Sequence, residues 1–358
     1  LQIFMKSIKD ISQLKIGYVP TTQSLEAIAD RGRFCNYAKK KGIKFEIADP
    51  NETYDLVVVT AGGDISVWSK YQKGNAKIIY DQVDSYLAIP DFDIKGALRG
   101  LAKFFSGQHR SLQLSYKKAI QNMSKRADAV SCASEVQKKD FILHNKNVHV
   151  ILDVHNDLTQ NIKKDYTAKK PFNLVWEGLP VTLHHFFEIR DVLKSVNSQQ
   201  EICLHIVTNL EYYQYLRKYG KRNTIDMCRK IFDHVYLYDW NIQLASTIIC
   251  ACDMAIIPIS PNDSFAMGKP SNKLLLFWKM GMPTITTATP AYVHAMDQAN
   301  LDMACQTKSE WSEKLLKYMN DETARRGAGE KGKAYTDSFF SDENAIAQWD
   351  NLIQSVFE

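Results

Sequence analysis

The sequence has no long uninterrupted apolar run, although 45% of its 358 residues are hydrophobic. A helix that spans a membrane needs about 20 consecutive apolar residues, so we expect none here. The first ten residues, LQIFMKSIKD, also lack the pattern of a secretory signal. These absences predict a cytoplasmic protein.

Cysteine is too scattered for a disulfide framework. The seven cysteines are an odd number in apolar strand and helix contexts, which is typical of reduced core thiols. Cys250 and Cys252 have no second ligand pair, so a zinc site is not expected. The sequence also has no low-complexity tract and no repeat of solenoid period. What remains is an ordinary globular composition, with 24% charged residues.

What the sequence does contain is a regular alternation of short β-rich runs with amphipathic segments. The runs of the N-terminal half are KIGYV, KFEIA, DLVVVT, KIIYD, DAVSCAS and VHVIL. Helices are expected between several of them, for example over residues 24–41 and 135–145. The polar stretch HNDLTQNIKKDYTAKKP then interrupts the pattern and is expected to link two domains.

The alternation restarts with FNLVWEG, CLHIVT, HVYLY and DMAIIPI, and helices are expected over 183–196, 211–219 and 241–251. Strands separated by helices form parallel, doubly wound sheets. The expected fold class is therefore α/β, with two facing Rossmann-like domains and a C-terminal helix. We place the N-terminal domain at residues 1–160, the second domain at 170–340, and the helix, which could cross back to the first domain, at 341–358.

A basic motif lies at the mouth of a helix in the second domain. Lys269-Pro270-Ser271-Asn272-Lys273 follows the buried run 254–259 and precedes an apolar helix. The first turn of a helix has unpaired N–H groups and the positive end of the dipole, and so attracts phosphate. The alternative is that Ser271 only caps the helix while both lysines are solvated.

Ligands of open α/β sheets bind at the carboxyl ends of the strands. That rule selects the loops at 61–64, 81–90, 178–180, 208–209, 238–240 and 260–272. Asp84 and Asp81 are the catalytic candidates, because either carboxylate could take a proton from an acceptor hydroxyl or position it. The alternative is that Asp81 caps a turn and Asp84 faces water.

The order of these parts resembles that of the GT-B glycosyltransferases. Ser271-Asn272-Lys273-Leu274, followed by Gly281-Met282-Pro283, is similar to a motif of the retaining bacterial enzymes that build surface polysaccharides. RADAVSCASEVQKKDF, VWEGLP and VYLYDWNIQLASTIICACDMAIIPI resemble further segments of those enzymes. The Glu-x7-Glu acids of that family fall on Gly268 and Leu276, so neither acid is retained. This departure leaves the donor and the stereochemical outcome open.

The resemblance implies transfer of a sugar from a nucleotide-sugar donor to a growing surface glycan or glycolipid acceptor. It implies no cofactor and no metal, because such enzymes stabilise the leaving phosphate with helix dipoles and basic side chains. The donor-side candidates are Gly178, Thr208, Tyr238, Trp240, Lys269, Ser271, Asn272 and Lys273. The acceptor-side candidates are Gly63, Arg31 and His109. Asp91-Phe92-Asp93 matches the metal-binding Asp-x-Asp of another transferase group, which the two-domain pattern disfavours.

Three alternatives stay open for the activity. Because both family acids are missing while Lys269 and Lys273 remain, a CMP-linked acidic sugar is an alternative to a UDP-, GDP- or dTDP-hexose donor. A nucleotide-sugar epimerase of the same fold is a second alternative. The third is a noncatalytic protein that binds a nucleotide or nucleic acid.

A basic block lies at residues 94–126, where eight lysines and arginines occur without one acid. Leu98, Leu101, Ala102 and Phe105 would share one face of a helix there. The block predicts contact with an anionic membrane surface and a peripheral location on the inner face of the cytoplasmic membrane. The alternative is an ordinary helix that packs inward. A nucleic-acid partner is weakly supported, because the block lacks regular aromatic residues.

Overall fold

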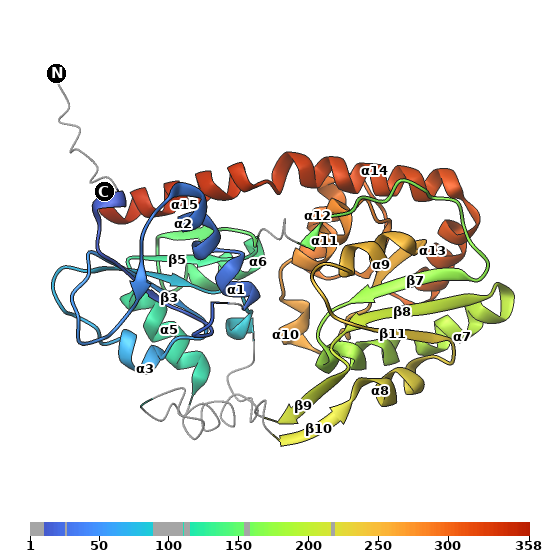
Figure 1. Cartoon of the computed structure of the whole chain (residues 1–358), viewed down its shortest axis with the longest axis horizontal. Helices are drawn as coiled ribbons and strands as arrows, with labels where there is room; N and C mark the ends of the chain where they lie inside the picture. Colours follow the sequence, from blue (N-terminus) through green and yellow to red (C-terminus); the bar gives the residue numbers. More distant parts are fainter. Residues whose placement is uncertain (1–10, 26, 89–109, 111–114, 154–157, 216–218) are drawn as a thin grey trace. The chain divides into compact units, whose positions relative to one another are not determined.

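The computed structural model describes residues 11–25, 27–88, 110, 115–153, 158–215 and 219–358. The chain divides into two compact units. Unit 1 contains residues 1–154, 268–270 and 342–358, and unit 2 contains residues 155–267 and 271–341. Each unit is built on a parallel sheet flanked by helices (Figure 1). The expected α/β class, with two parallel-sheet domains and a C-terminal helix, is confirmed.

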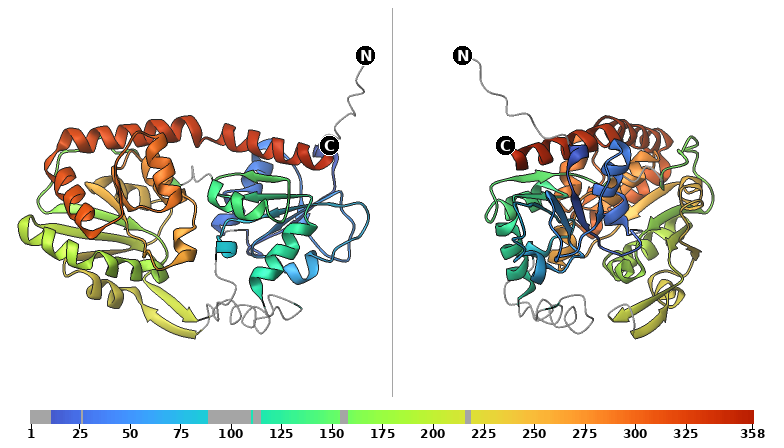
Figure 2. Two further views of the ribbon diagram at one scale, coloured as in Figure 1. Left: turned by 180° about the vertical axis from the view of Figure 1, so that it is seen from behind. Right: turned by 60° about the vertical axis from the view of Figure 1, so that its left-hand side comes forward.

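Unit 1 contains six parallel strands in the order β2-β1-β3-β4-β5-β6. The strands are β1 Ile16–Val19, β2 Glu46–Ile47, β3 Leu56–Thr60, β4 Lys77–Asp81, β5 Ala129–Cys132 and β6 Val148–Val150. The helices are η1 Ile11–Gln13, α1 Ile28–Arg31, α2 Phe34–Lys41, α3 Ile65–Trp68, η2 Tyr86–Ala88, α5 Tyr116–Arg126, α6 Glu135–Phe141 and α15 Asp342–Phe357. The C-terminal α15 packs beside α2 on one face of this sheet (Figures 1 and 2).

The β3 run Leu-Val-Val-Val-Thr explains why this sheet is covered on both faces. Leu56 and Val58 pack in one core together with Trp349 of α15, whereas Val57 and Val59 pack in the other. Successive side chains of a strand point to opposite faces, so a continuous β-branched run suits a strand that is buried on both sides.

Unit 2 contains six parallel strands in the order β11-β8-β7-β12-β13-β14. The strands are β7 Phe172–Glu177, β8 Ile202–Thr208, β11 Val235–Asp239, β12 Met254–Ile257, β13 Thr284–Thr287 and β14 Ala304–Cys305. The helices are η4 Pro180–Glu188, α7 Arg190–Gln199, α8 Thr224–Ile231, α9 Ala245–Ala251, α10 Ser264–Met267, α11 Asn272–Lys279, α12 Pro290–Gln298, α13 Lys308–Asn320 and α14 Glu322–Phe339. None of the described helices has the length and apolarity needed to cross a membrane.

An antiparallel hairpin stands where the sequence predicted a helix over 211–219. Its strands are β9 Glu211–Tyr215 and β10 Tyr219–Asn223, and the register pairs Tyr213 with Lys221. Tyrosine favours strands, and in a short segment of mixed polarity the spacing of apolar residues does not distinguish a helix from a strand. The helix prediction was therefore wrong here.

Two other expected helices are interrupted. The segment 24–41 contains α1 and α2 with a break between them, where Arg33 adopts φ −124° and ψ −117°. Gly32 lies in the break and disfavours a helix interior, and the Arg33 side chain is buried in unit 1. The segment 183–196 is divided between the 3-10 helix η4 and α7.

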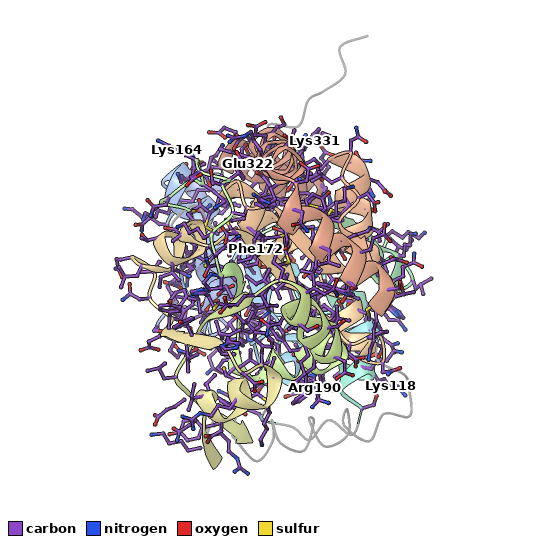
Figure 3. The ribbon with its side chains drawn as sticks, turned by 90° about the vertical axis from the view of Figure 1, so that its right-hand side faces the viewer. Lys118, Lys164, Phe172, Arg190, Glu322 and Lys331 are labelled. Carbon is purple, nitrogen blue, oxygen red and sulfur yellow. The ribbon has the colours of Figure 1, made fainter. Side chains whose placement is uncertain are left out.

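Glycine lets α14 lie close to the end of α11. A methyl group at Gly329 would lie 2.6 Å from the Tyr166 hydroxyl oxygen and would also meet the Gly281 carbonyl oxygen. A methyl group at Gly327 would meet no atom within 4 Å. The other face of α14 carries Glu322 and Lys331 in solvent, whereas Phe172 lies in the interior of the unit (Figure 3).

These two glycines should respond oppositely to the same change. We expect Gly329→Ala to lower the free energy of unfolding by about 1–3 kcal/mol, because the added carbon overpacks a backbone contact. We expect Gly327→Ala to raise it by about 0.5–1 kcal/mol, because alanine is the better helix former. Urea denaturation of both variants measures the difference, and equal effects would contradict the close contact.

Candidate functional site

The strand order of unit 2 reverses between β7 and β12. The chain leaves β7 toward β8 on one side, and it leaves β12 toward β13 on the other. In doubly wound sheets such a switch point is where ligands bind, outside the carboxyl ends of the strands. The two loops at this point are the one that begins at Gly178 and the one at 258–271, which leads into α11.

The loop at Gly178 is fixed by the end of β8. The hydroxyl of Thr208, which is fully buried, donates to the Gly178 carbonyl at 2.6 Å. A methyl group at Gly178 would lie 2.8 Å from the Trp176 ring and would also collide with the Lys273 ammonium. Glycine is therefore needed here for the ammonium to approach the backbone. The structure thus brings together three predicted residues, Gly178, Thr208 and Lys273.

Lys273 is a half-buried side chain in the first turn of α11. Its Nζ lies 4.4 Å from the centroid of the Trp176 ring. Ser271, two residues before Lys273, is the N-cap residue of α11. Within the described residues its side chain makes no capping hydrogen bond. The interpretation of Ser271 as a plain side-chain cap is therefore not supported. Asn272 is the first residue of the helix.

Glu177, which the sequence analysis missed, is the last residue of β7 and lies in the same cluster. Its Oε1 accepts a hydrogen bond of 3.2 Å from the Trp240 indole Nε1. Burial raises the pKa of this carboxyl, while the charge of Lys273 and the Trp240 hydrogen bond lower it. The feature of the sequence that could have predicted Glu177 is the position of this acid directly before the glycine of VWEGLP.

Trp240 and Tyr238 take different positions, although Tyr238 lies in β11 and Trp240 directly follows that strand. The Trp240 backbone N–H donates to the Thr208 carbonyl at 3.1 Å, which places this residue at the carboxyl edge of the sheet. The Tyr238 hydroxyl lies 3.0 Å from His205 Nδ1. His205 pairs in register with Tyr236, two residues earlier, so the Tyr238 hydroxyl points away from that edge. Trp240 therefore belongs to the cluster, and Tyr238 does not.

Unit 1 has its own switch point, between β1 and β3. The loops there approach closely, because a methyl group at Gly62 would lie 3.0 Å from the Thr21 carbonyl oxygen. A methyl group at the predicted acceptor-side Gly63 would lie 2.8 Å from Val19 Cγ1. The buried Asp30 holds the other loop, accepting the Thr21 N–H at 2.7 Å.

The other two acceptor-side candidates are Arg31 and His109. Arg31 is the last residue of α1, next to Asp30. His109 lies outside the described residues, as does the Asp91-Phe92-Asp93 tripeptide.

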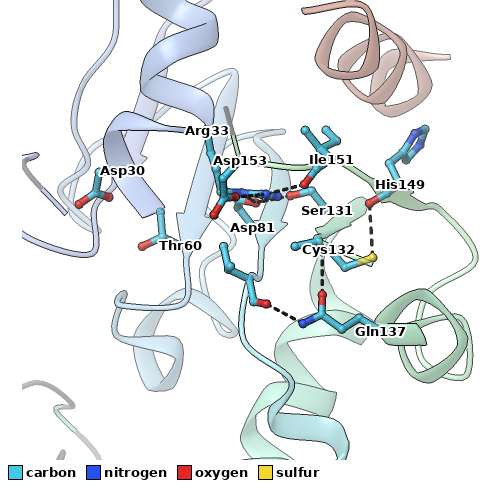
Figure 4. A network of polar contacts seen from close by, with 12 residues as sticks. Asp30, Arg33, Thr60, Asp81, Ser131, Cys132, Gln137, His149, Ile151 and Asp153 are labelled. Atoms are coloured by element: carbon cyan, nitrogen blue, oxygen red, sulfur yellow. Dashed lines mark hydrogen bonds and ion pairs between the residues drawn. The ribbon is translucent and has the colours of Figure 1, made fainter. Parts of the chain in front are cut away.

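Asp81 lies inside unit 1 rather than at an open loop (Figure 4). Arg33 Nε and Nη2 donate to its carboxylate, with Nη2 at 2.6 Å from Oδ1, and the Ser131 hydroxyl donates to the same oxygen. Arg33 Nη1 also donates to Asp153 at 2.7 Å. This carboxylate is buried and occupied, so the predicted role of Asp81 as a base needs correction: its contacts assign it to the interior of the unit.

Arg33 is the central donor of that network. Its side chain is fully buried, and burial alone lowers the pKa of its guanidinium, but Asp81 and Asp153 more than offset this effect and raise it. Asp84, by contrast, has a side chain that is 39% exposed, and its Oδ1 lies 3.9 Å from Nζ of Lys269, a residue that groups with unit 1. The two catalytic candidates therefore differ in burial: Asp81 lies in the interior of unit 1, and Asp84 is partly exposed.

No family model and no curated protein matches this sequence. Solved structures do match it, among them HepE from Anabaena in complex with UDP and glucose, with a TM-score of 0.64 and 12% identity over 96% of this chain and 100% of that chain. TarM, known from S. aureus, gives a TM-score of 0.60 and 13% identity over 83% of this chain and 54% of that chain. This chain has the GT-B fold. A glycosyltransferase from Rickettsia africae matches with a TM-score of 0.60 and 10% identity, over 96% and 98% of the two chains.

Some of the proteins with matching structures are much longer than this GT-B chain. The chain spans about half the length of TarM, with 54% of that chain matched, and 57% of the matched chain of the GtfA/B complex. At these identities the likeness concerns the fold, so the activity must be argued from the residues of the site.

A possible metal cluster occurs in unit 2 of this GT-B chain. Among the described residues, ligand atoms of His184, His185 and Asp263 lie within 4.8 Å of one another. However, the Ser260 backbone N–H donates to His185 Nδ1 at 3.1 Å. A neutral imidazole that accepts at Nδ1 carries its proton on Nε2 and has no lone pair left for a metal. The cluster therefore does not fit an ion unless this hydrogen bond breaks.

The basic block at 94–126 is described only in part. The segment with Leu98 and Phe105, predicted to be a helix, lies outside the described residues. In the described part, α5 buries Tyr116, Ile120 and Met123 within unit 1. For α5 the apolar face therefore packs inward, and contact of the block with a membrane stays a prediction.

Proposed function

We propose that this chain is a glycosyltransferase that moves a sugar from a nucleoside diphosphate sugar to a glycan or glycolipid acceptor. The observation that carries the proposal is the cluster of Lys273, Gly178 and Trp240 at the switch point of unit 2, beside the N-terminus of α11. A cation, a glycine loop and a helix dipole together suit a leaving phosphate.

The substrate class is inferred from the neighbours in structure. HepE was solved with UDP and glucose, and a TarM mutant was solved with UDP and α-GlcNAc-glycerol. WaaG, with a TM-score of 0.52, is a glycosyltransferase of lipopolysaccharide biosynthesis. These relatives favour UDP as the nucleotide and a surface glycan or glycolipid as the acceptor of this chain.

The chemistry requires three tasks of the protein. The dipole of α11 and Lys273 would stabilise the negative charge that develops on the leaving diphosphate. The Trp240 ring, oriented by the hydrogen bond of its N–H to Glu177, would stack on the base. Asp84, the more exposed of the two aspartates, would take the proton of the acceptor hydroxyl. No step of this scheme uses a metal or a cofactor.

A CMP-linked acidic sugar is the less favoured donor. That alternative depended on a donor site without acids, in which Lys269 and Lys273 would attract a sugar carboxylate. Glu177 places a carboxyl group beside Lys273, and Lys269 lies 3.9 Å from Asp84. Both lysines thus have acidic neighbours, which weakens the electrostatic attraction that this alternative requires.

A nucleotide panel tests the proposal. We expect UDP to raise the melting temperature of the protein, because a ligand at about 100 times its Kd stabilises the folded state by about 2.7 kcal/mol. Thermal shifts with UDP, GDP, dTDP, CDP and CMP would rank the bases. A response to CMP without one to UDP would contradict the diphosphate donor, and no response to any nucleotide would contradict the function.

A further inference from the structure

Glu177 places a negative charge where the proposed function requires a site for phosphates. A carboxylate near a phosphate weakens phosphate binding by repulsion unless a cation compensates. Its position at the end of β7 therefore needs a physical account.

Three elements hold Glu177. It ends β7, the Trp240 indole that donates to it at 3.2 Å follows β11, and Lys273 belongs to α11. Lys273 in turn lies 4.4 Å from the centroid of the Trp176 ring, on the residue that precedes Glu177. The carboxyl group thus accepts a hydrogen bond from the aromatic ring proposed to bind the base, and it lies within the electrostatic influence of the cation proposed to bind phosphate.

We propose that Glu177 is a positioning residue that sets the affinity of this site for nucleotide-sugar phosphates by partly neutralising Lys273 while it orients Trp240. The inference rests on the proposed function, in which unit 2 binds a UDP-sugar. In its charged form Glu177 reduces the net positive charge offered to the diphosphate. In its protonated form it leaves the charge of Lys273 to the ligand.

The direction of the pH effect follows from these contacts. Burial raises the pKa of Glu177 above its ordinary value, and Lys273 acts against that rise. As the pH falls through this pKa, the site becomes more positive and should bind a diphosphate more tightly. His184, His185 and Asp263, on η4 and on the loop after β12, are other ionisable side chains of unit 2, so the wild-type profile alone does not isolate Glu177.

The variant Glu177→Gln isolates the contribution of the Glu177 charge. Glutamine keeps an oxygen that can accept the Trp240 N–H but removes the charge. We expect it to tighten UDP-glucose binding about tenfold at pH 8 and low salt, and to flatten the pH dependence of that binding. Uridine carries no phosphate, so its affinity should change less than about twofold. Isothermal calorimetry with both probes measures these values.

Two further variants separate the explanations. Glu201→Gln makes the same charge change just before β8, at the amino edge of the same sheet, and should leave both affinities unchanged. In a Lys273→Met background, Glu177→Gln should lose its tightening effect, because the two residues are coupled.

The outcomes are distinct. Weaker UDP-glucose binding by Glu177→Gln would overturn the inference, because it would mean that the carboxylate itself holds the donor. An equal shift for uridine would also overturn it. Absence of UDP and UDP-glucose binding to the wild-type protein would overturn the proposed function together with the inference, whereas wild-type binding with no change in Glu177→Gln would overturn the inference alone.

Discussion

Replacing Arg33 by methionine is expected to lower the free energy of unfolding of unit 1 by about 3–5 kcal/mol. The guanidinium is fully buried and donates to the carboxylates of Asp81 and Asp153, which are themselves only 1% and 3% exposed. Its removal leaves two carboxylates in the interior with no cation between them. An uncompensated buried charge costs far more than a lost surface ion pair.

The measurement needs a probe of unit 1 and a matched control. Val57 and Val58 of β3 are fully buried in unit 1, so the hydrogen exchange of their amides at rising urea concentration reports on its unfolding. Lys41→Met removes an exposed lysine of unit 1 whose Nζ lies 3.1 Å from Asp350, and it should cost less than about 1 kcal/mol. If Arg33→Met cost no more than this control, the buried network would not be a main contributor to the stability of unit 1.

This network marks a limit of prediction from sequence. Asp-Arg-Gly-Arg contains two arginines two residues apart, and the local pattern does not say which of them turns inward. The partners of Arg33 come from the ends of distant strands, so only the fold reveals them. Arg31 was therefore predicted as an acceptor-side residue, and Arg33 was not predicted to have a role.

The strands of the two sheets were easier to predict, because their β-branched runs carry a clear pattern. The loops at Gly178 and before Lys273 were also expected, since both follow such runs. Glu177 was not, because the comparison with related motifs directed attention to acids missing at Gly268 and Leu276. The motif of the helix at 272–279 contains no information on an acid at the end of a distant strand, so Glu177 was not predicted from it.

Asp84→Asn is expected to reduce sugar transfer about 10²- to 10⁴-fold, the usual contribution of a general base. The loop after β4 leaves this side chain 39% exposed, in contrast to the buried Asp81. Asparagine has a similar shape but takes no proton, so we expect the fold and the affinity for UDP to change little.

Two control variants make that result specific. Glu52→Gln neutralises an exposed acid before β3, at the amino edge of the same sheet, and should leave transfer unchanged. Asp81→Asn should lower stability, because it weakens the pairing with Arg33. UDP release from a UDP-sugar in the presence of an acceptor measures transfer, and calorimetry measures UDP affinity. If Asp84→Asn lost binding and transfer in equal measure, Asp84 would hold the donor rather than act as the base, and full activity would remove it from the site.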